Sequence, residues 1–390
     1  MIYIACISRD EADYLAEKER NVIYTPMTYK AMNIAYEAHD GQQDRSGAPY
    51  IFHPYHIAES MPDEMTACAA LLHDTVEDTD ITIEDLAEEF PPEVVETVGL
   101  LTHEKGVPYL EYVRKLKGNS AARMIKLADL AHNSDSARLA AGTAAEEDIK
   151  RLSEKYASAR AVLNEDFKLI AVTNFEEGTA LENAAEKTAE LLSSGTDAVV
   201  LRAKQLPEGE YAELFRDAYG RKPAAGGRLV WHAHAAAAGI MRSTGDAAAA
   251  HEAGTDSVRR PACSAIQLPF SDFADMMADH DASRILPDIV GVSVHSPEEA
   301  EQAGALGASY AVFGHVFPTD SKRGRAPRGL DQLRLAVLRA GIPVFAIGGI
   351  KPWNISDVRD SGCGGACIMS GFMQAPDAQL FVKQLREKLR

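Results

Sequence analysis

The sequence predicts a multidomain protein, an all-α helical bundle followed by an α/β TIM barrel. The chain has 390 residues, which at about 100–200 residues per domain is enough for two domains. Residues 22–165 show the apolar spacing of consecutive amphipathic helices, whereas residues 166–390 alternate short apolar runs with helical segments. We therefore place the domain boundary between Glu165 and Asp166.

The helices of the first half are predicted from apolar spacing and from residues that start or stop a helix. Pro91-Pro92 separates two helices, and Asn119-Ser120 is a suitable N-cap for a third. The predicted helices are Tyr29–Ala38, Asp63–Thr75, Glu84–Glu89, Val94–Leu101, the segment from Asn119-Ser120 through Asn133, and Glu146–Leu163.

The second half is predicted to contain eight β/α units in about 225 residues, which indicates a TIM barrel with its chemistry at the C-terminal ends of the strands. Several runs are apolar at consecutive positions, as is typical of strands buried on both faces. A doubly wound sheet is the alternative. The predicted strands are Leu169–Thr173, Ala198–Leu201, Leu229–His232, Ala265–Leu268, Ile289–Val294, Tyr310–Phe313, Pro343–Ile347 and Ala366–Met369. A further short strand is predicted at Met1–Ser8, and the alanine-rich stretch Ala233–Ala250 favours a helix.

The charge is distributed unevenly along the chain. The formal net charge is −18, and residues 1–165 hold 16 basic and 30 acidic residues, a net of −14. From Ser46 to Glu104 there are 14 acids and no Lys or Arg. Since phosphate backbones and anionic membranes bind clustered cations, we expect neither nucleic acid nor a membrane as a partner.

Other compositional features predict a cytoplasmic protein. Five scattered cysteines are too few for a disulfide framework. The apolar N-terminus lacks the basic residues of a signal peptide, and the chain has no stretch of 18 apolar residues. Whether the chain forms a homo-oligomer is left open by the sequence.

One segment of the helical half points to a metal. The adjacent pair His73-Asp74 offers a nitrogen and a carboxylate oxygen to one divalent cation of the manganese class, and His53 and Asp129 are further candidate ligands. Glu77 and Asp78 follow one helical turn later and would orient a water or take its proton. For the pair alone, surface acids beside a capping histidine are the alternative.

Four motifs of the helical half, taken in their order along the chain, resemble those of a known family. The motifs are Ala38-His-Asp-Gly-Gln42, Gly47-Ala-Pro-Tyr-Ile-Phe-His-Pro54, His73-Asp-Thr-Val-Glu-Asp-Thr79 and Lys126-Leu-Ala-Asp129. Together they closely resemble the HD-type hydrolase domain of RelA/SpoT enzymes and small alarmone hydrolases, over residues 22–165. The resemblance implies removal of the 3′-pyrophosphate from ppGpp-like nucleotides.

The same resemblance assigns residues to roles. It implies Mn²⁺, or another divalent cation, on His53, His73, Asp74 and Asp129, with Glu77 and Asp78 supporting the attacking water. It also implies substrate contacts from Asn133, and we add Arg45 and Lys126 as candidate cations for the substrate phosphates. The chain departs from the family at Asp44 and Leu130, where the family carries basic residues. His103 and His132 have no partner that the sequence identifies.

The barrel half contains a candidate phosphate site. Gly348-Gly349 follows the predicted seventh strand and Ser370 the eighth, where backbone N–H groups commonly bind phosphate. Arg202 and Lys204 follow the second strand, and Thr319 and Lys322 lie in a basic loop after the sixth. An ordinary turn and a solvated loop are the alternatives. His295 ends the fifth strand and has a side-chain type suited to proton transfer near neutral pH.

These segments are similar to the thiamine phosphate synthase/TenI family over about residues 167–376. The specific pieces are Gly291-Val-Ser-Val-His-Ser296, Gly314-His-Val-Phe-Pro-Thr-Asp-Ser-Lys322 and Ala346-Ile-Gly-Gly-Ile350. Among family members the thiazole tautomerases resemble the chain most, since both have Gly-His at Gly314-His315. This implies that His295 moves a proton on a carboxythiazole phosphate whose phosphate is held by Gly349 and Ser370.

The resemblance also bears on magnesium in the barrel. Synthases carry an Asn-Asp pair after strand three, and its Asp helps hold Mg²⁺. This pair corresponds to His232-Ala233 here, so the carboxylate is absent. Asp272 corresponds to the other acidic position, and one acid makes a poor magnesium site.

The sequence thus predicts a bifunctional fusion of a metal-dependent nucleotide pyrophosphohydrolase and a thiazole tautomerase, with small phosphorylated substrates. Two alternatives remain for the barrel, an active thiamine phosphate synthase or a non-catalytic ligand-sensing module that regulates the hydrolase.

Overall fold

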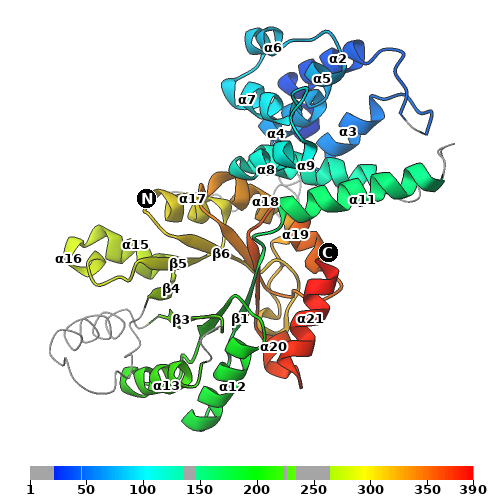
Figure 1. The fold of residues 1–390 in the computed structure, drawn as a ribbon. Coiled ribbons are helices and arrows are strands. Elements are labelled where there is room, and N and C mark those ends of the chain that lie inside the picture. The colour runs from blue at the N-terminus through cyan, green and yellow to red at the C-terminus, as the bar shows by residue number, and fades with distance from the viewer. Residues whose placement is uncertain (1–21, 45, 136–145, 223–225, 234–263, 390) are drawn as a thin grey trace. The chain divides into compact units, whose positions relative to one another are not determined.

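The computed structural model describes residues 22–44, 46–135, 146–222, 226–233 and 264–389. It divides into two compact units, Met1–Glu165 and Asp166–Arg390. The first unit is helical and the second is a closed eight-stranded barrel, which confirms the predicted fold class (Figure 1). No helix in the described part of the chain is both long enough and apolar enough to cross a bilayer.

The helical unit is built around α4 (Glu64–Leu72). Every side chain from Thr66 to Leu72 is buried, and the helix packs against α2, α3 and α7. A helix that is apolar all round is expected at the centre of a helical domain. The other elements of this unit are the 3₁₀ turn Val22–Tyr24, α2 (Pro26–Ala38), α3 (Phe52–Glu59), α5 (Thr75–Asp78), α6 (Ile83–Glu89), α7 (Pro92–Leu101), α8 (Tyr109–Lys115), the 3₁₀ turn Leu116–Gly118, α9 (Ser120–Asn133) and α11 (Glu146–Leu163).

Side-chain caps fix where the helices that carry the site begin. Asp63 caps α4 by accepting a hydrogen bond from the Thr66 amide at 2.8 Å. Asn119 caps α9 in the same way with the Ala122 amide at 2.9 Å, as its sequence position predicts.

The helical unit differs from the prediction at three places. Helix α3 is not predicted because Pro54 interrupts the pattern, although proline is tolerated in the first turn of a helix, where it lies here. Helix α8 is also not predicted. The single helix expected over Asp63–Thr75 ends at Leu72, and a separate turn, α5, carries Glu77 and Asp78. The strand expected at Met1–Ser8 and nearly all of the alanine-rich stretch lie outside the described residues.

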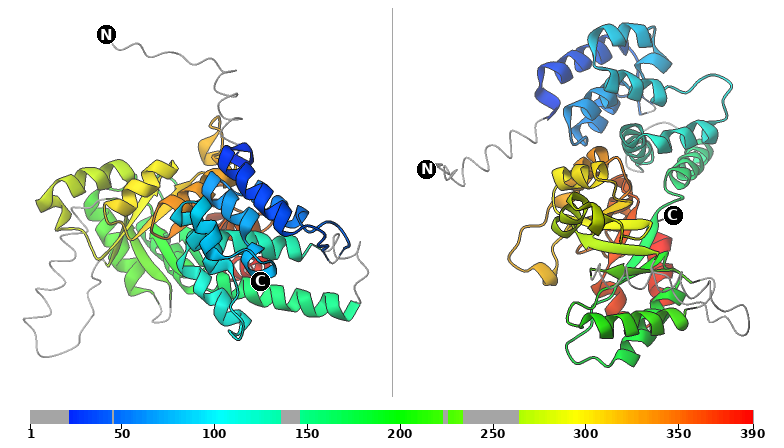
Figure 2. Two further views of the ribbon diagram at one scale, coloured as in Figure 1. Left: turned by 90° about the horizontal axis from the view of Figure 1, so that it is seen from above. Right: turned by 90° about the vertical axis from the view of Figure 1, so that its left-hand side faces the viewer.

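In the barrel unit, each strand pairs in parallel with the next, and β8 closes on β1 with Lys168 opposite Gly365. The helices lie outside the closed sheet (Figure 2). The interior is filled by side chains from alternate positions of the strands: Ile170, Val172, Val200, Val230, Ala265, Val312 and Cys367. Such a barrel is a packed core whose open end can hold a site.

The eight observed strands lie within one residue of the predicted ends. They are β1 (Lys168–Val172), β2 (Ala198–Leu201), β3 (Arg228–His232), β4 (Ala265–Pro269), β5 (Ile289–Val294), β6 (Tyr310–Gly314), β7 (Val344–Ile347) and β8 (Gly365–Ile368). The helices are α12 (Leu181–Ser193), α13 (Glu208–Gly220), α15 (Phe270–Ala278), α16 (His280–Ser283), α17 (Pro297–Ala305), α18 (Gly329–Arg339), α19 (Ile355–Asp360), α20 (Ser370–Gln374) and α21 (Ala378–Lys388), with a 3₁₀ turn at Asp320–Lys322.

Candidate functional sites

Three helices of the first unit bring a buried metal-ligand set together. His53 comes from α3, His73 from the C-terminal end of α4 and Asp129 from α9, and their ligand atoms all lie within 4.8 Å of one another. Each of the three residues is at most 4% exposed. Buried imidazole and carboxylate groups at this spacing form a donor set suited to a divalent cation.

Asp74, the fourth predicted ligand, lies beside the three. Its Oδ2 is 2.9 Å from Nε2 of His73 and 3.8 Å from Nε2 of His53. The Tyr50 hydroxyl donates a hydrogen bond to the same oxygen at 2.5 Å. Sequence reasoning did not identify Tyr50, which comes from the loop before α3.

The hydrogen bonds of His73 show that its Nε2 suits a cation. Its Nδ1 must carry a proton, because it donates to the carbonyl oxygen of Ala70 at 2.8 Å. In the neutral ring, Nε2 has a lone pair, and this buried atom has no hydrogen-bond partner although Asp74 Oδ2 is close by. A buried lone pair facing a carboxylate is compensated when a positive ion lies between them.

The electrostatics of the cluster also favour a positive charge. Burial alone would lower the pKa of His73, but the negative charges of Asp74 and Asp129 outweigh it and raise that pKa to about 9. Burial opposes ionisation of Asp74, yet His73 holds the pKa of its carboxyl well below the usual range. For Asp129, burial also opposes ionisation, and Lys126, His53 and His73 together lower the pKa of its carboxyl well below the usual range. The two carboxylates therefore remain charged in a buried place.

The residues proposed to bind the nucleotide have different surroundings. Lys126 Nζ lies 2.7 Å from Oδ2 of Asp129, and Asn133 donates to Oδ1 of the same carboxylate. Both side chains thus contact Asp129, a predicted metal ligand. Arg45 lies outside the described residues. Leu130, at a position where the resembled family carries a basic residue, is fully buried in the core.

The two acids predicted to handle water lie on the exposed turn α5. Glu77 accepts a hydrogen bond from the backbone N–H of His103 at 2.9 Å, which ties the turn to the loop after α7. The pKa of Asp78 is raised by its partial burial and by the negative charges of Asp74 and Glu77. A carboxylate with a raised pKa is a better proton acceptor than an ordinary surface acid.

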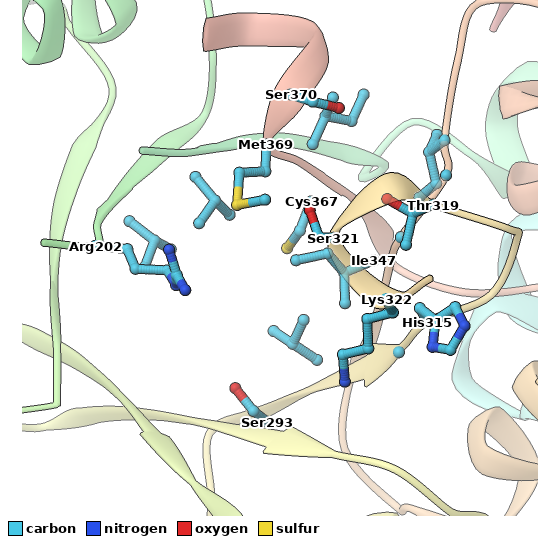
Figure 3. Close-up of a pocket in the computed structure, with 18 of the residues that line it drawn as sticks. Arg202, Ser293, His315, Thr319, Ser321, Lys322, Ile347, Cys367, Met369 and Ser370 are labelled. Carbon is cyan, nitrogen blue, oxygen red and sulfur yellow. The ribbon is translucent and has the colours of Figure 1, made fainter. Parts of the chain in front are cut away.

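The barrel holds a cavity of about 270 Å³ at the C-terminal ends of its strands (Figure 3). Arg202 and Lys322 approach it from different sides, as Figure 3 shows. Seven of the eight predicted barrel residues line it: Arg202, His295, Thr319, Lys322, Gly348, Gly349 and Ser370. Lys204, the eighth, is exposed and is not among the lining residues.

The glycine pair at the end of β7 can only be glycine. Gly348 and Gly349 have φ values of +102° and +68°, which disfavour any side chain. A Cβ at Gly349 would also lie 2.5 Å from the carbonyl oxygen of Pro318. The loop after β6 therefore packs directly on this backbone.

His295 lines the cavity, and the carboxylate of Glu299 lies next to its ring. Glu299 lies in the first turn of α17 and accepts a hydrogen bond from the backbone N–H of His295 at 2.6 Å. Its Oε2 lies 3.6 Å from Nδ1 of the His295 ring. Burial and the positive charge of Lys322 lower the pKa of His295, against the opposing effect of Glu299. The imidazole is therefore neutral near pH 7 and able to accept a proton.

Sequence reasoning missed several polar residues that line the cavity, including Gln267 and Ser293. The Tyr310 hydroxyl donates to Oε1 of Gln267 at 3.2 Å, and Gln267 Nε2 donates to Ser293 Oγ at 2.9 Å. This chain of contacts joins three strands, and no local sequence pattern could reveal it. His232 also lines the cavity, whereas Asp272 is exposed and not among the lining residues.

Comparison with known proteins finds a family model that matches a part of each unit. A family model described as HD domain matches residues 31–135, and one described as thiamine monophosphate synthase matches residues 273–372. The thiamine-phosphate synthase of Lacticaseibacillus paracasei is 40% identical over 105 residues, 27% of this chain and 49% of the relative. That of Pyrococcus furiosus is 41% identical over 107 residues, 27% of this chain and 52% of the relative. The chain thus spans about half the length of the curated relatives it matches.

Two solved structures resemble one part of the chain each. A thiamine phosphate pyrophosphorylase from Pyrococcus furiosus is 27% identical, with a TM-score of 0.44, over 58% of this chain and 97% of its own. A metazoan ortholog of SpoT, described as hydrolysing ppGpp, is 26% identical, with a TM-score of 0.32, over 36% of this chain and 86% of its own.

Proposed function

We propose that the chain is a bifunctional enzyme. It carries an HD domain followed by a domain of the thiamine monophosphate synthase type, and both domains indicate an enzyme. The HD domain is proposed to be a Mn²⁺-dependent pyrophosphohydrolase of ppGpp-like nucleotides. The barrel is proposed to be a thiazole tautomerase. The buried His53–His73–Asp129 cluster carries the first proposal, and His295 in the lining of the barrel cavity carries the second.

In the hydrolase, the buried residues fit a divalent cation held by His53, His73, Asp74 and Asp129. When bound, such a cation supplies Lewis-acid activation of water and of a phosphoryl oxygen. Asp78 and Glu77 on α5 would orient the attacking water and accept its proton. Lys126 stays protonated beside Asp129: burial lowers the pKa of its ammonium group, but the charge and hydrogen bond of Asp129, together with Tyr112 and Tyr109, raise it well above its ordinary value.

A polyanionic substrate must approach a domain whose half of the chain has a net charge of −14. Arg123 does not offset this charge at the site, because its guanidinium binds the Leu163 carbonyl and the Asn164 side chain, both at 3.0 Å. We therefore assign the local compensation to Lys126, Arg45 and the cation itself.

The hydrolase proposal is tested by release of pyrophosphate from ppGpp with Mn²⁺ present. We expect His73→Ala and Asp74→Ala to lower turnover at least 100-fold, because each removes a ligand. The exposed Glu88→Gln variant on α6 is the control and should match the wild type. Unchanged turnover in both ligand variants would contradict the proposal.

In the tautomerase, the Gly348-Gly349 backbone and Ser370 would hold the phosphate of a carboxythiazole phosphate. Neutral His295 would take a proton from one ring position and return it at another, which leaves the aromatic thiazole. His232-Ala233 stands where the synthases carry the Asn-Asp pair whose carboxylate helps hold Mg²⁺, which supports this reaction over a synthase.

An active synthase is the second candidate, supported by the names of the relatives. Two assays separate the two reactions, tautomerisation of the carboxythiazole phosphate without Mg²⁺ and coupling to a pyrimidine pyrophosphate with Mg²⁺. We expect only the first, and we expect His295→Gln to slow it roughly 10²–10⁴-fold. Coupling activity would instead establish the synthase, and an unaffected rate in His295→Gln would exclude His295 as the acid–base group.

A further inference from the structure

His53 directs its two ring nitrogens to different partners. Nε2 lies in the metal-ligand cluster, 3.2 Å from Oδ1 of Asp129. Nδ1 points to another imidazole, with its partner atom, Nδ1 of His132, 2.7 Å away. His132 lies on α9, three residues after Asp129. One turn of that helix therefore supplies both the candidate ligand Asp129 and the contact to the candidate ligand His53.

The chemistry of the cluster sets the direction of this hydrogen bond. A hydrogen bond between two imidazole nitrogens needs one donor and one acceptor. If Nε2 of His53 presents its lone pair to a cation, the proton of this ring must lie on Nδ1. His53 is then the donor, and Nδ1 of His132 is the acceptor.

We propose that His132 is a positioning residue for the metal site: by accepting the proton of His53 Nδ1, it fixes the tautomer and ring orientation that direct Nε2 to the cation. The proposal rests on the metal-dependent function proposed above. Partners of this kind behind metal-bound histidines commonly set ligand orientation and basicity.

The other histidine of the cluster provides a comparison within the same molecule. His73 is held in the equivalent way, but by the backbone carbonyl of Ala70 at 2.8 Å. A backbone acceptor cannot be removed by substitution, whereas His132 can be replaced. His53 is therefore the ligand whose orientation depends on a side chain that mutation can test.

The chain offers a matched control at His56. The ring of this exposed α3 residue packs against that of His132, with centroids 4.6 Å apart and planes tilted by 35°. The rings of His53 and His132 are 4.9 Å apart at 30°. If His132 acted through ring packing alone, substitution of His56 would also weaken the site, whereas a role of His132 as hydrogen-bond acceptor does not involve His56.

The experiment uses the full chain, freed of metal, with Mn²⁺ as the titrant in calorimetry. His132→Phe keeps a ring but removes the acceptor, and we expect Mn²⁺ affinity to fall about 10–100-fold. His132→Asn places a carbonyl oxygen near the original Nδ1, so its affinity should stay within a few-fold of the wild type. His56→Phe should bind Mn²⁺ like the wild type. Circular dichroism of each metal-free variant checks that its helices are intact.

A second readout separates positioning from catalysis. Since the expected defect is in metal binding, saturating Mn²⁺ should restore most of the pyrophosphate release by His132→Phe. Wild-type affinity in His132→Phe, or an equal loss in His132→Asn, would overturn the inference while leaving the metal site in place. A wild-type chain that binds no Mn²⁺ would overturn the proposed hydrolase, and the inference with it.

Discussion

At the scale of the residue, both sites depend on which nitrogen of a histidine is available. His73 has one nitrogen committed to Ala70 and the other facing Asp74. His295 is held neutral by burial and by Lys322. The sequence predicts these histidines because each lies in a short motif. It does not predict His132 as the partner of His53, since the two are separated by 79 residues and meet only through the packing of α3 and α9.

The pKa of His295 leads to a prediction about the barrel. The charge of Lys322 disfavours the imidazolium form, so Lys322→Ala should raise the pKa of His295. A base must be unprotonated to act, so the acidic limb of the pH profile of kcat/KM for tautomerisation should move to higher pH. Glu299 has the opposite influence, and Glu299→Gln should move that limb to lower pH.

The matched control for these variants is Arg334→Ala, which removes a cation of α18 that is paired with Asp331 and does not line the cavity. It should leave the pH profile unchanged. If Lys322→Ala and Glu299→Gln shift the limb in the same direction, the electrostatic assignment of His295 is wrong.

At the scale of the element, prediction succeeds where one periodicity governs a whole segment. The eight strands are found within one residue because each is an apolar run bounded by turn residues. Helix α3 is missed because Pro54 lies in its first turn. The break after Leu72 is also missed, because the apolar stripe does not show that His73 leaves the helix to join the cluster.

The contact between α17 and α18 gives a prediction about packing. A Cβ at Gly304 would lie only 1.9 Å from the carbonyl oxygen of Ala340, so Gly304→Ala must push the two helices apart. We expect it to lower the free energy of unfolding of the barrel by about 1–3 kcal/mol, as overpacking does.

The matched variant for this prediction is Gly209→Ala in α13, where an added Cβ would meet nothing within 4 Å. It should be neutral or stabilise by about 0.4–1 kcal/mol, because alanine restricts the unfolded chain. Urea unfolding followed by circular dichroism measures both variants. Equal effects of the two would show that loss of glycine, not the helix contact, decides stability.

At the scale of the whole molecule, composition separates the two units but does not reveal their sites. Of the net charge of −18, −14 belongs to residues 1–165, and four of the acids concerned are Asp74, Glu77, Asp78 and Asp129. The structure places two of these in or beside a buried cluster and two on an exposed turn. The total charge cannot distinguish buried from exposed acids, because the burial of an acid depends on which helices pack together.

The division into two units predicts how the molecule responds to metal. Each unit has its own buried core, so we expect Mn²⁺ to stabilise the helical unit alone. A ligand at about 100 times its dissociation constant stabilises the native state by about 2.7 kcal/mol. For a unit of this size, that corresponds to an increase of roughly 5–10 °C in unfolding temperature.

Calorimetry of the full chain with and without Mn²⁺ measures this response, because the two units should unfold in separate transitions. Only the transition of the helical unit should move, and in His73→Ala it should stay where it is without metal, since that variant lacks a buried ligand. His295→Gln should show the wild-type shift, because His295 belongs to the barrel. A shift that persists in His73→Ala, or that moves the barrel transition instead, would place the Mn²⁺ site elsewhere. A shift of the helical unit's transition alone would locate the metal at the residues from its three helices and would show that the barrel's stability does not depend on Mn²⁺.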